Sequence, residues 1–289
     1  MNIMKINIPI EQTIKNRSSI RTYDKRKLDI DDKEKLINFF NDLSNPFGEE
    51  VKFHFIEKST EPNGEKLGTY GVIKGASSFI GATVADTEFG LEALGYEFEN
   101  LILYATYIGL GTVWLAATFS RGSFASAMKI SEDELFPAIS PVGYPIGKKS
   151  LKESVMRKIM KSDQRKPWDK LFFNNNFSTP LTEKESGIYL APLEMLRLAP
   201  SATNAQPWRI LKVKDIIHFY VSHNSNTRDE EKLIKRVDLG IGISHFHQVA
   251  LEHGLSGDFK KLSQENIQVP ENTKYIISWV TKDKEIPEI

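Results

Sequence analysis

Two arginines and a serine stand at alternate positions near the start of the chain, in the segment Arg17-Ser18-Ser19-Ile20-Arg21. Residues two apart lie on one face of an extended chain, so both guanidinium groups and the Ser19 hydroxyl would point the same way. Guanidinium groups donate in a fork and a serine hydroxyl adds a short adjustable donor, which suits a phosphate attached to a chain of hydroxyls. The same pattern would also fit a solvated basic turn.

A second polar segment, at residues 199–208, reads Ala-Pro-Ser-Ala-Thr-Asn-Ala-Gln-Pro-Trp. Its two prolines restrict the backbone, while Ser201, Asn204 and Gln206 supply both donors and acceptors. Such a stiff loop could hydrogen-bond the polar edge of a heterocycle without rearranging. The alternative is a structural turn that leads into the next strand. A plain turn rarely needs two prolines around such a polar set, so the composition favours binding.

Two further segments are less specific. Residues 109–118 read Gly-Leu-Gly-Thr-Val-Trp-Leu-Ala-Ala-Thr. Gly109 can end a helix with a positive φ, and the small residues that follow would let a flat ligand approach the backbone. Taken alone, this segment is evidence about the fold and not about a binding site. Arg165, in Arg-Lys-Pro-Trp, adds positive charge, and a charged linker explains it equally well.

Periodicity predicts the elements that hold these segments. Helices are expected at 31–43, 90–108, 182–198 and 238–253, of which 90–108 is apolar nearly all round and therefore buried. Strands are expected at 51–57, 77–85, 112–115, 137–144, 209–213, 216–221 and 275–281. Capping boxes are predicted at Ser131 with Glu134 and at Thr182 with Glu185.

The two long helices carry related residues at a constant spacing. Leu94-Gly95 recurs as Leu239-Gly240, and the offset, 240 − 95 = 145, also relates Ala105 to Ala250. A few shared Leu, Gly and Ala residues could arise by chance, but the order helix, strand, strand, long helix, strand is repeated too. We therefore predict a duplication or a fusion of two protomers, with a first half at 1–150, a crossover linker at 151–180 and a second half at 181–289.

The bulk composition excludes several classes of protein. The 289 residues include 38 Lys+Arg and 38 Asp+Glu, a zero balance that argues against a nucleic-acid partner or an anionic membrane surface. The absence of cysteine excludes disulfides and thiolate chemistry. No apolar run approaches the roughly 20 residues of a membrane span, and the start lacks the apolar core of a signal peptide. A soluble cytoplasmic protein is expected, with its histidines in structural or surface positions and no metal site.

Taken together, these segments resemble the nitroreductase family of FMN-dependent oxidoreductases. Its landmarks are an Arg-x-Ser-x-Arg/Lys start, a Pro-Ser-x-x-Asn-x-Gln-Pro-Trp loop, a long helix ending in Gly-Leu-Gly-Thr-x-Trp, and a late Arg-x-Pro. Ordinary members are homodimers with FMN at the subunit interface. Here the early position of the Pro-Ser loop holds a poor copy, at residues 42–47, and the good copy lies in the second half, which lacks an Arg-x-Ser-x-Arg.

The resemblance therefore implies a single-chain, fused-dimer branch of the family. The implied fold class is α+β: two homologous α/β halves, each with a mainly antiparallel sheet packed by helices, related by a pseudo-twofold axis within one chain. It also implies one intact FMN site between the halves and one decayed site. The chain would be a monomer or form a further homo-oligomer.

Carried over position by position, the family pattern implies that Arg17, Ser19 and Arg165 hold the phosphate and ribityl end of FMN, and that Arg21 approaches the pyrimidine edge of the ring. The other residues implied to contact FMN are Ser18, Tyr70, Ala117, Thr118, Pro200, Ser201 and Asn204. Tyr70 is assigned to the ring edge or the entrance.

The implied chemistry is ping-pong. NAD(P)H would reduce the flavin by hydride transfer and leave, and a small-molecule electron acceptor of the nitroaromatic or quinone type would enter the same cleft. Because the flavin carries the reaction, no catalytic side chain is predicted. A different class of function stays open, namely a non-catalytic FMN-binding carrier or sensor.

Overall fold

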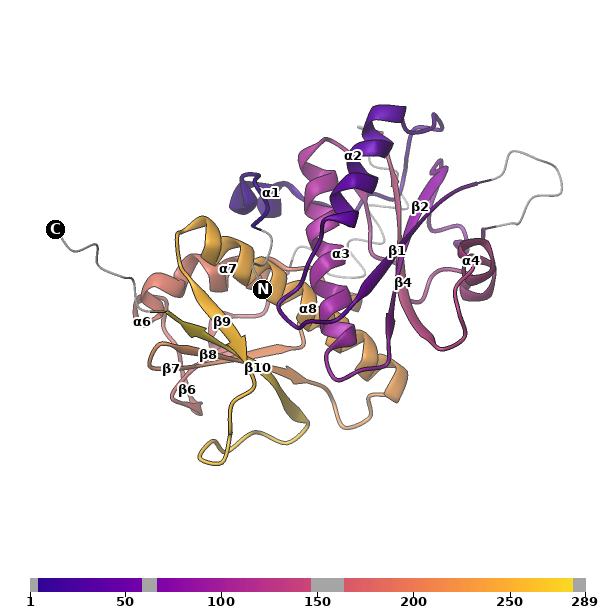
Figure 1. Cartoon of the computed structure of the whole chain (residues 1–289). Helices are drawn as coiled ribbons and strands as arrows, with labels where there is room; N and C mark the ends of the chain where they lie inside the picture. Colours follow the sequence, from indigo (N-terminus) through magenta and orange to yellow (C-terminus); the bar gives the residue numbers. More distant parts are fainter. Residues whose placement is uncertain (1–4, 59–66, 147–163, 283–289) are drawn as a thin grey trace.

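The computed structural model describes residues 5–58, 67–146 and 164–282, and within them two β-sheets lie on either side of a pair of long helices (Figure 1). These helices, α3 (Gly90–Tyr107) and α8 (Asp229–Glu252), pack against each other at the centre of the molecule. Nearly every side chain of α3 is buried, as its all-round apolar sequence predicts. The prediction of a mixed α/β fold with two mainly antiparallel sheets is confirmed.

The first sheet has the strand order β1-β2-β4-β3 and is antiparallel throughout. Its strands are β1 (Val51–Glu57), β2 (Ser78–Ala85), β3 (Gly111–Thr112) and β4 (Glu134–Gly143). Alternate side chains of β1, Phe53 and Phe55, pack against the core. His54, between them, hydrogen-bonds Thr83 on the neighbouring strand at 3.0 Å.

The second sheet has the order β6-β5-β7-β8-β10-β9, in which only the β5–β7 pair is parallel among the described strands. Its strands are β5 (Phe172–Asn174), β6 (Asn176–Pro180), β7 (Trp208–Val213), β8 (Ile216–Ser222), β9 (Gly257–Lys260) and β10 (Thr273–Thr281). Trp208, Phe219 and Trp279 from three of these strands join the same core as α3 and α8. The two sheets therefore share one apolar interior.

Shorter helices complete the fold. They are α1 (Ile10–Asn16), α2 (Ile30–Asn41), α4 (Arg121–Met128), α6 (Glu183–Ser186) and α7 (Leu190–Leu198). The predicted capping box at the start of α6 is confirmed, since Glu185 N donates to Thr182 Oγ1 and Thr182 N donates to the Glu185 carboxylate. The expected continuous helix is interrupted at Gly187, whose φ of 57° favours glycine.

Two expectations about local structure were wrong. Ser131 and Glu134 form no capping box: Ser131 hydrogen-bonds Asp133, and Glu134 begins β4 and pairs with Lys52 at 2.7 Å. The helix expected at 238–253 begins earlier, at Asp229, where an acidic first turn complements the helix dipole. Part of the range expected as a linker, 172–180, forms β5 and β6, while 151–163 lies outside the described residues.

The two long helices cross where each has a glycine. A Cβ on Gly95 would lie 2.2 Å from the Val237 carbonyl oxygen, and a Cβ on Gly240 would lie 2.1 Å from the Glu92 carbonyl oxygen. Any side chain there would separate the helices. Each glycine therefore faces the other helix in the same way. Glu92 and Val237 are related by the same spacing as the two glycines, because 237 − 92 = 145.

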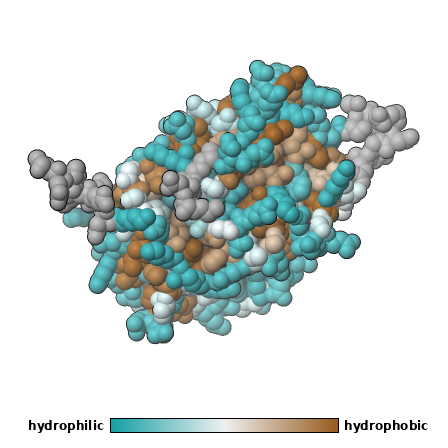
Figure 2. Space-filling model, viewed as in Figure 1, coloured by the Kyte–Doolittle hydropathy of each residue, from teal (hydrophilic) through white to brown (hydrophobic). Residues whose placement is uncertain are grey.

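The outer surface is mixed in character. Figure 2 shows hydrophilic side chains around most of the outline of one face, with hydrophobic ones gathered toward its middle. Among the residues that the structure describes, no helix combines the length and the apolar character that a membrane crossing requires.

Candidate functional site

A cavity of about 290 Å³ lies between the two halves of the chain. It is lined by three arginines and by polar and apolar residues from both halves, namely Arg17, Ser18, Ser19, Arg21, Val72, Val113, Trp114, Leu115, Ala116, Ala117, Thr118, Ala138, Arg165, Pro200, Ser201, Ala202, Thr203, Asn204, Ile234, Val237, Asp238 and Ile241. Segments far apart in the sequence therefore meet at one hollow.

All the residues predicted to bind a cofactor line this cavity, except Tyr70. The Tyr70 side chain is 71% exposed, and its φ of 47° places it in a turn just before the cavity residue Val72. The structure thus brings together the Arg/Ser motif, Ala117, Thr118, Arg165 and the Pro-Ser loop, and it leaves Tyr70 outside.

The Arg/Ser motif runs as an extended strand-like segment beside β3. Ile20 N donates to the Thr112 carbonyl oxygen at 2.9 Å, and Ser19 pairs with Thr112 in a parallel bridge. Gly111 allows this close approach, because a Cβ there would lie 3.0 Å from the Ile20 side chain. The extended backbone is the conformation in which alternate side chains share one face.

A buried carboxylate forms an ion pair with Arg17 at the cavity wall. Glu99 on α3 is fully buried, and its Oε1 lies 3.9 Å from Arg17 Nε. Glu99 Oε2 accepts a hydrogen bond from Trp114 Nε1 at 2.7 Å, and Oε1 lies 3.0 Å from His245 Nε2. His245 Nδ1 is 2.9 Å from the Met195 carbonyl oxygen, which can only accept, so Nδ1 carries a proton.

The Pro-Ser loop has an unusual backbone for its residue types. Thr203, Asn204 and Gln206 all have positive φ, at 53°, 56° and 48°. Non-glycine residues in this region are uncommon, and such conformations cluster at functional sites. Within the loop, Gln206 N donates to Ser201 Oγ at 2.9 Å, which fixes the polar turn.

Residues 164–166 hold the Pro-Ser loop in place. An Arg165 guanidinium nitrogen donates to the Leu198 carbonyl oxygen at 2.9 Å, and Lys166 N donates to Gln206 Oε1 at 2.8 Å. Asn204 Nδ2 donates to the Gln164 carbonyl oxygen at 2.8 Å. Burial lowers the pKa of Lys166 to about 8, and its ammonium group hydrogen-bonds the Ala205 carbonyl oxygen.

One wall of the cavity is an inward-facing stripe of α8, which sequence reasoning missed. It presents Ile234, Val237 and Ile241, together with the carboxyl group of Asp238. Asp238 Oδ1 accepts a hydrogen bond from Ala202 N at 2.9 Å, and burial raises the pKa of Asp238 to about 7. The sequence offers one sign of this wall, namely a single acidic residue, Asp238, inside the apolar run at 237–243.

The region related to this cavity by the 145-residue spacing is filled with aromatic side chains. Cavity residues Trp114, Ile234 and Ile241 correspond to Phe259, Phe89 and Tyr96. Phe47 comes from the poor copy of the Pro-Ser loop, and its ring centroid lies 5.8 Å from that of Phe89 and 6.2 Å from those of Tyr96 and Phe259. Aromatic rings therefore contact one another at positions that correspond to residues lining the cavity.

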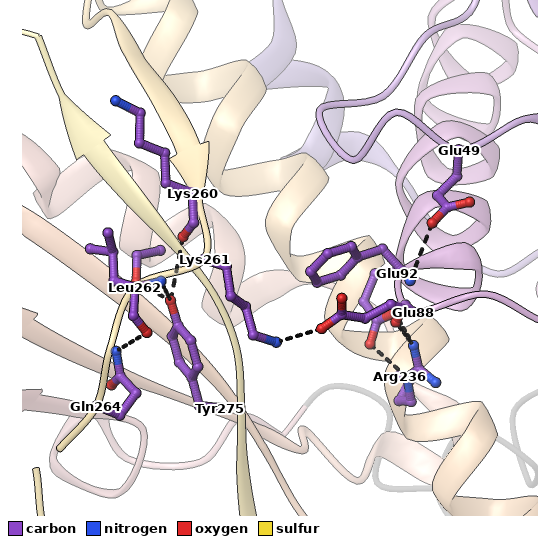
Figure 3. Close-up of polar contacts among 11 residues, drawn as sticks. Glu49, Glu88, Glu92, Arg236, Lys260, Lys261, Leu262, Gln264 and Tyr275 are labelled. Atoms are coloured by element: carbon purple, nitrogen blue, oxygen red, sulfur yellow. Dashed lines mark hydrogen bonds and ion pairs between the residues drawn. The ribbon is translucent and has the colours of Figure 1, made fainter.

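Two ion pairs join the halves here, Lys261 with Glu88 and Arg236 with Glu92 (Figure 3). Lys261, which corresponds to the cavity residue Ala116, lies 3.0 Å from Glu88 and stacks 5.1 Å from the Phe89 ring centroid. Nearby, Arg236 of α8 pairs with the fully buried Glu92 of α3 at 2.7 Å. The long side chain of Lys261 therefore stands at the position that corresponds to the small Ala116 of the cavity.

Comparison with known proteins places the chain in a family. Residues 9–250 match the model of a family described as "Putative TM nitroreductase". No curated protein matches. Among solved structures, one described as a putative nitroreductase from Thermotoga maritima is 21% identical, with 97% of each chain covered and a TM-score of 0.61.

Shorter nitroreductase-family structures match about half of this chain. One from Clostridium novyi NT is 22% identical, covers 50% of this chain and 91% of its own, and has a TM-score of 0.39. A nitroreductase with bound FMN from Bacteroides fragilis is 17% identical, covers 51% of this chain and 94% of its own, and has a TM-score of 0.40.

Proposed function

Because the chain belongs to the nitroreductase family, whose model it matches over residues 9–250, we propose that it is an FMN-dependent oxidoreductase that uses NAD(P)H to reduce small nitroaromatic or quinone-type acceptors. The observation that carries the proposal is the cavity between the halves. There the Arg/Ser motif of the first half faces the Pro-Ser loop of the second.

The residues around the cavity fit the chemistry of FMN. Arg17 and Arg165 supply guanidinium groups for a phosphate, Ser19 supplies a hydroxyl for the ribityl chain, and Arg21 supplies a cation for the pyrimidine edge. The apolar stripe of α8 suits the face of a flat ring system. The volume of about 290 Å³ is close to the lower end of ligand pockets, which is about 300 Å³.

We assign the residues as follows. Arg17, Ser18, Ser19 and Arg165 bind the phosphate and ribityl end. Arg21 lies at the pyrimidine edge, where a cation favours reduced flavin. Pro200, Ser201 and Asn204 orient the ring from the other half, and the backbone at Ala117 and Thr118 lies near the reactive nitrogen; we propose no contact for Tyr70.

When bound, FMN would supply the hydride chemistry, accepting hydride from NAD(P)H and passing it to the acceptor. The chain's own contribution is binding and orientation. The buried Glu99 holds Arg17 ready for a phosphate, and the hydrogen bonds from residues 164–166 keep the Pro-Ser loop rigid. Preformed contacts of this kind reduce the entropic cost of binding.

We also propose that the two halves descend from one duplicated unit. The reciprocal glycine contacts between α3 and α8 support this. The pairs Glu99–His245 and Asn100–Ser244 support it too. A shift of 145 residues relates Glu99 to Ser244 (244 − 99 = 145) and Asn100 to His245 (245 − 100 = 145), so it converts one pair into the other.

The test of the proposed function is the visible spectrum of the purified protein, recorded with and without NADH or NADPH under anaerobic conditions. A yellow protein that bleaches on addition of either nucleotide is the expected result, and acceptors can then be screened. A yellow protein that does not bleach would contradict the reductase and leave an FMN carrier or sensor. A colourless protein that cannot be reconstituted with FMN would contradict both.

A further inference from the structure

The carboxyl group of Asp238 is a buried acceptor on the wall of the cavity. Its residue is 3% exposed, and Oδ1 accepts the hydrogen bond from Ala202 N. Oδ2 has no hydrogen-bond partner among the residues that the structure describes. A buried acceptor left unsatisfied destabilises the structure, so a ligand that offers a donor here would gain binding energy.

The position of Asp238 indicates which part of a ligand it faces. It contacts the middle of the Pro-Ser loop, the segment proposed to orient the flavin ring. Arg17 and Arg165, which are proposed to bind the phosphate, belong to other segments of the cavity wall. In its oxidised form, the flavin ring system carries a single N–H group, at N3 of the pyrimidine ring.

Resting on the proposed function, we infer that Asp238 Oδ2 accepts a hydrogen bond from N3–H of the flavin, and that its charge keeps the reduction potential of the bound flavin low. A carboxylate beside the ring disfavours the addition of electrons. Burial raises the pKa of Asp238 to about 7 while Lys235 opposes the shift, so a substantial anionic fraction is present at neutral pH.

The corresponding position on α3 supports a role for Asp238 in the cavity. The position related to Asp238 by the 145-residue spacing is Ala93 on α3, beside the region that aromatic rings fill. If the carboxyl served only the packing of the two helices, a carboxyl would be expected at this position on each of them. It is present on the side that has a cavity and absent from the side that has none.

The experiment compares the wild type with D238N and with E97Q. The amide introduced by D238N would keep an oxygen for Ala202 N and lose both the charge and the second acceptor. Glu97 is a matched control, because it is also a helical carboxyl whose pKa burial raises to about 7, but it bonds Asn45 and does not line the cavity. We measure the FMN dissociation constant by fluorescence and the midpoint potential with reference dyes.

In D238N, FMN should bind about tenfold more weakly. The ratio of affinities for reduced over oxidised FMN should rise about tenfold, which raises the midpoint potential by about 30 mV for a two-electron couple. E97Q should match the wild type. An unchanged potential in D238N would overturn the inference and leave Asp238 as an anchor of the loop.

A second probe covers the case in which D238N does not fold. The wild type should bind 3-methyl-FMN, which lacks the N3–H, at least tenfold more weakly than FMN, and D238S should lose most of that preference. Equal binding of both flavins by the wild type would overturn the inference. A wild type that binds no flavin would instead contradict the proposed function, so the two failures are distinguishable.

Discussion

At the scale of single residues, the cavity is organised around charges that are already held in position. Arg17 is nearly buried beside Glu99, which also accepts from Trp114 and faces His245. A carboxylate with several partners can remain buried at tolerable cost. It also holds Arg17 at the cavity wall, so the end of the cavity proposed to bind phosphate is preorganised.

Replacing Arg17 with alanine should weaken FMN binding. A hydrogen bond to a charged group contributes about 1.5–3 kcal/mol, which corresponds to a roughly 10- to 100-fold higher Kd. The measurement is FMN fluorescence quenching on titration with the protein. R26A is the matched control, since it removes the same charge from a surface arginine stacked on Tyr144, away from the cavity lining. Equal losses of affinity in the two variants would show that only net charge matters.

Sequence alone could identify the cavity residues that belong to compact motifs. The Arg/Ser motif and the Pro-Ser loop each place their polar side chains within a few positions, so their spacing alone predicts a binding site. Asp238 could not be assigned this way, because it reaches the cavity through the packing of α8 and contacts Ala202, which lies 36 positions away. Tyr70 was chosen for its type in a glycine-rich segment, and its backbone turns the ring outward to solvent.

At the scale of elements, the crossing of α3 and α8 fixes the distance between the two walls of the cavity. Arg17 is held through Glu99 of α3, while Val237, Asp238 and Ile241 belong to α8. The glycine contacts set how closely the helices approach. Stability and the shape of the site are therefore linked at this crossing.

Gly95→Ala should destabilise the fold. Its Cβ would meet the Val237 carbonyl oxygen at 2.2 Å, and overpacking of this kind costs about 1–3 kcal/mol. Thermal unfolding followed by circular dichroism measures the loss. Gly122→Ala in α4 is the control: a Cβ added there would meet nothing within 4 Å, so a gain of about 0.5–1 kcal/mol is expected from the helical preference of alanine. A Tm for G95A at or above that of G122A would contradict the close crossing.

The elements that sequence patterns predicted are those with strong periodicity and a buried face. The helix at 90–108 and the longer strands β1, β2, β4, β7, β8 and β10 belong to this group. The short strands β5, β6 and β9 and the helices α1 and α4 were not predicted. Their lengths give little periodicity, and their conformations depend on neighbours distant in sequence, as when β5 pairs in parallel with β7. The capping box at Ser131 failed because sheet pairing of β4 outweighs a local helical signal.

At the scale of the whole molecule, the two sides that the proposed duplication would relate differ. One side combines a cavity, three arginines and the strained Pro-Ser loop. On the other, the ring of Phe47 packs against those of Phe89, Tyr96 and Phe259, three residues at positions that correspond to cavity-lining residues. A fused chain can change one side without changing the other, which a homodimer of identical subunits cannot do. Aromatic packing on the second side stabilises the contact between the halves.

This asymmetry predicts one FMN per chain. Flavin released by acid from the reconstituted protein should equal the molar amount of chain, measured by absorbance against a protein assay, and further assembly of chains should not change the ratio. Phe259→Ala provides the control: it would enlarge the aromatic region, yet the second half supplies no Arg-x-Ser-x-Arg for a phosphate, so the ratio should stay at one. Two flavins per wild-type chain would show that the rings move aside to admit a cofactor. A second flavin in F259A alone would show that aromatic packing, and not the missing arginines, keeps that side closed.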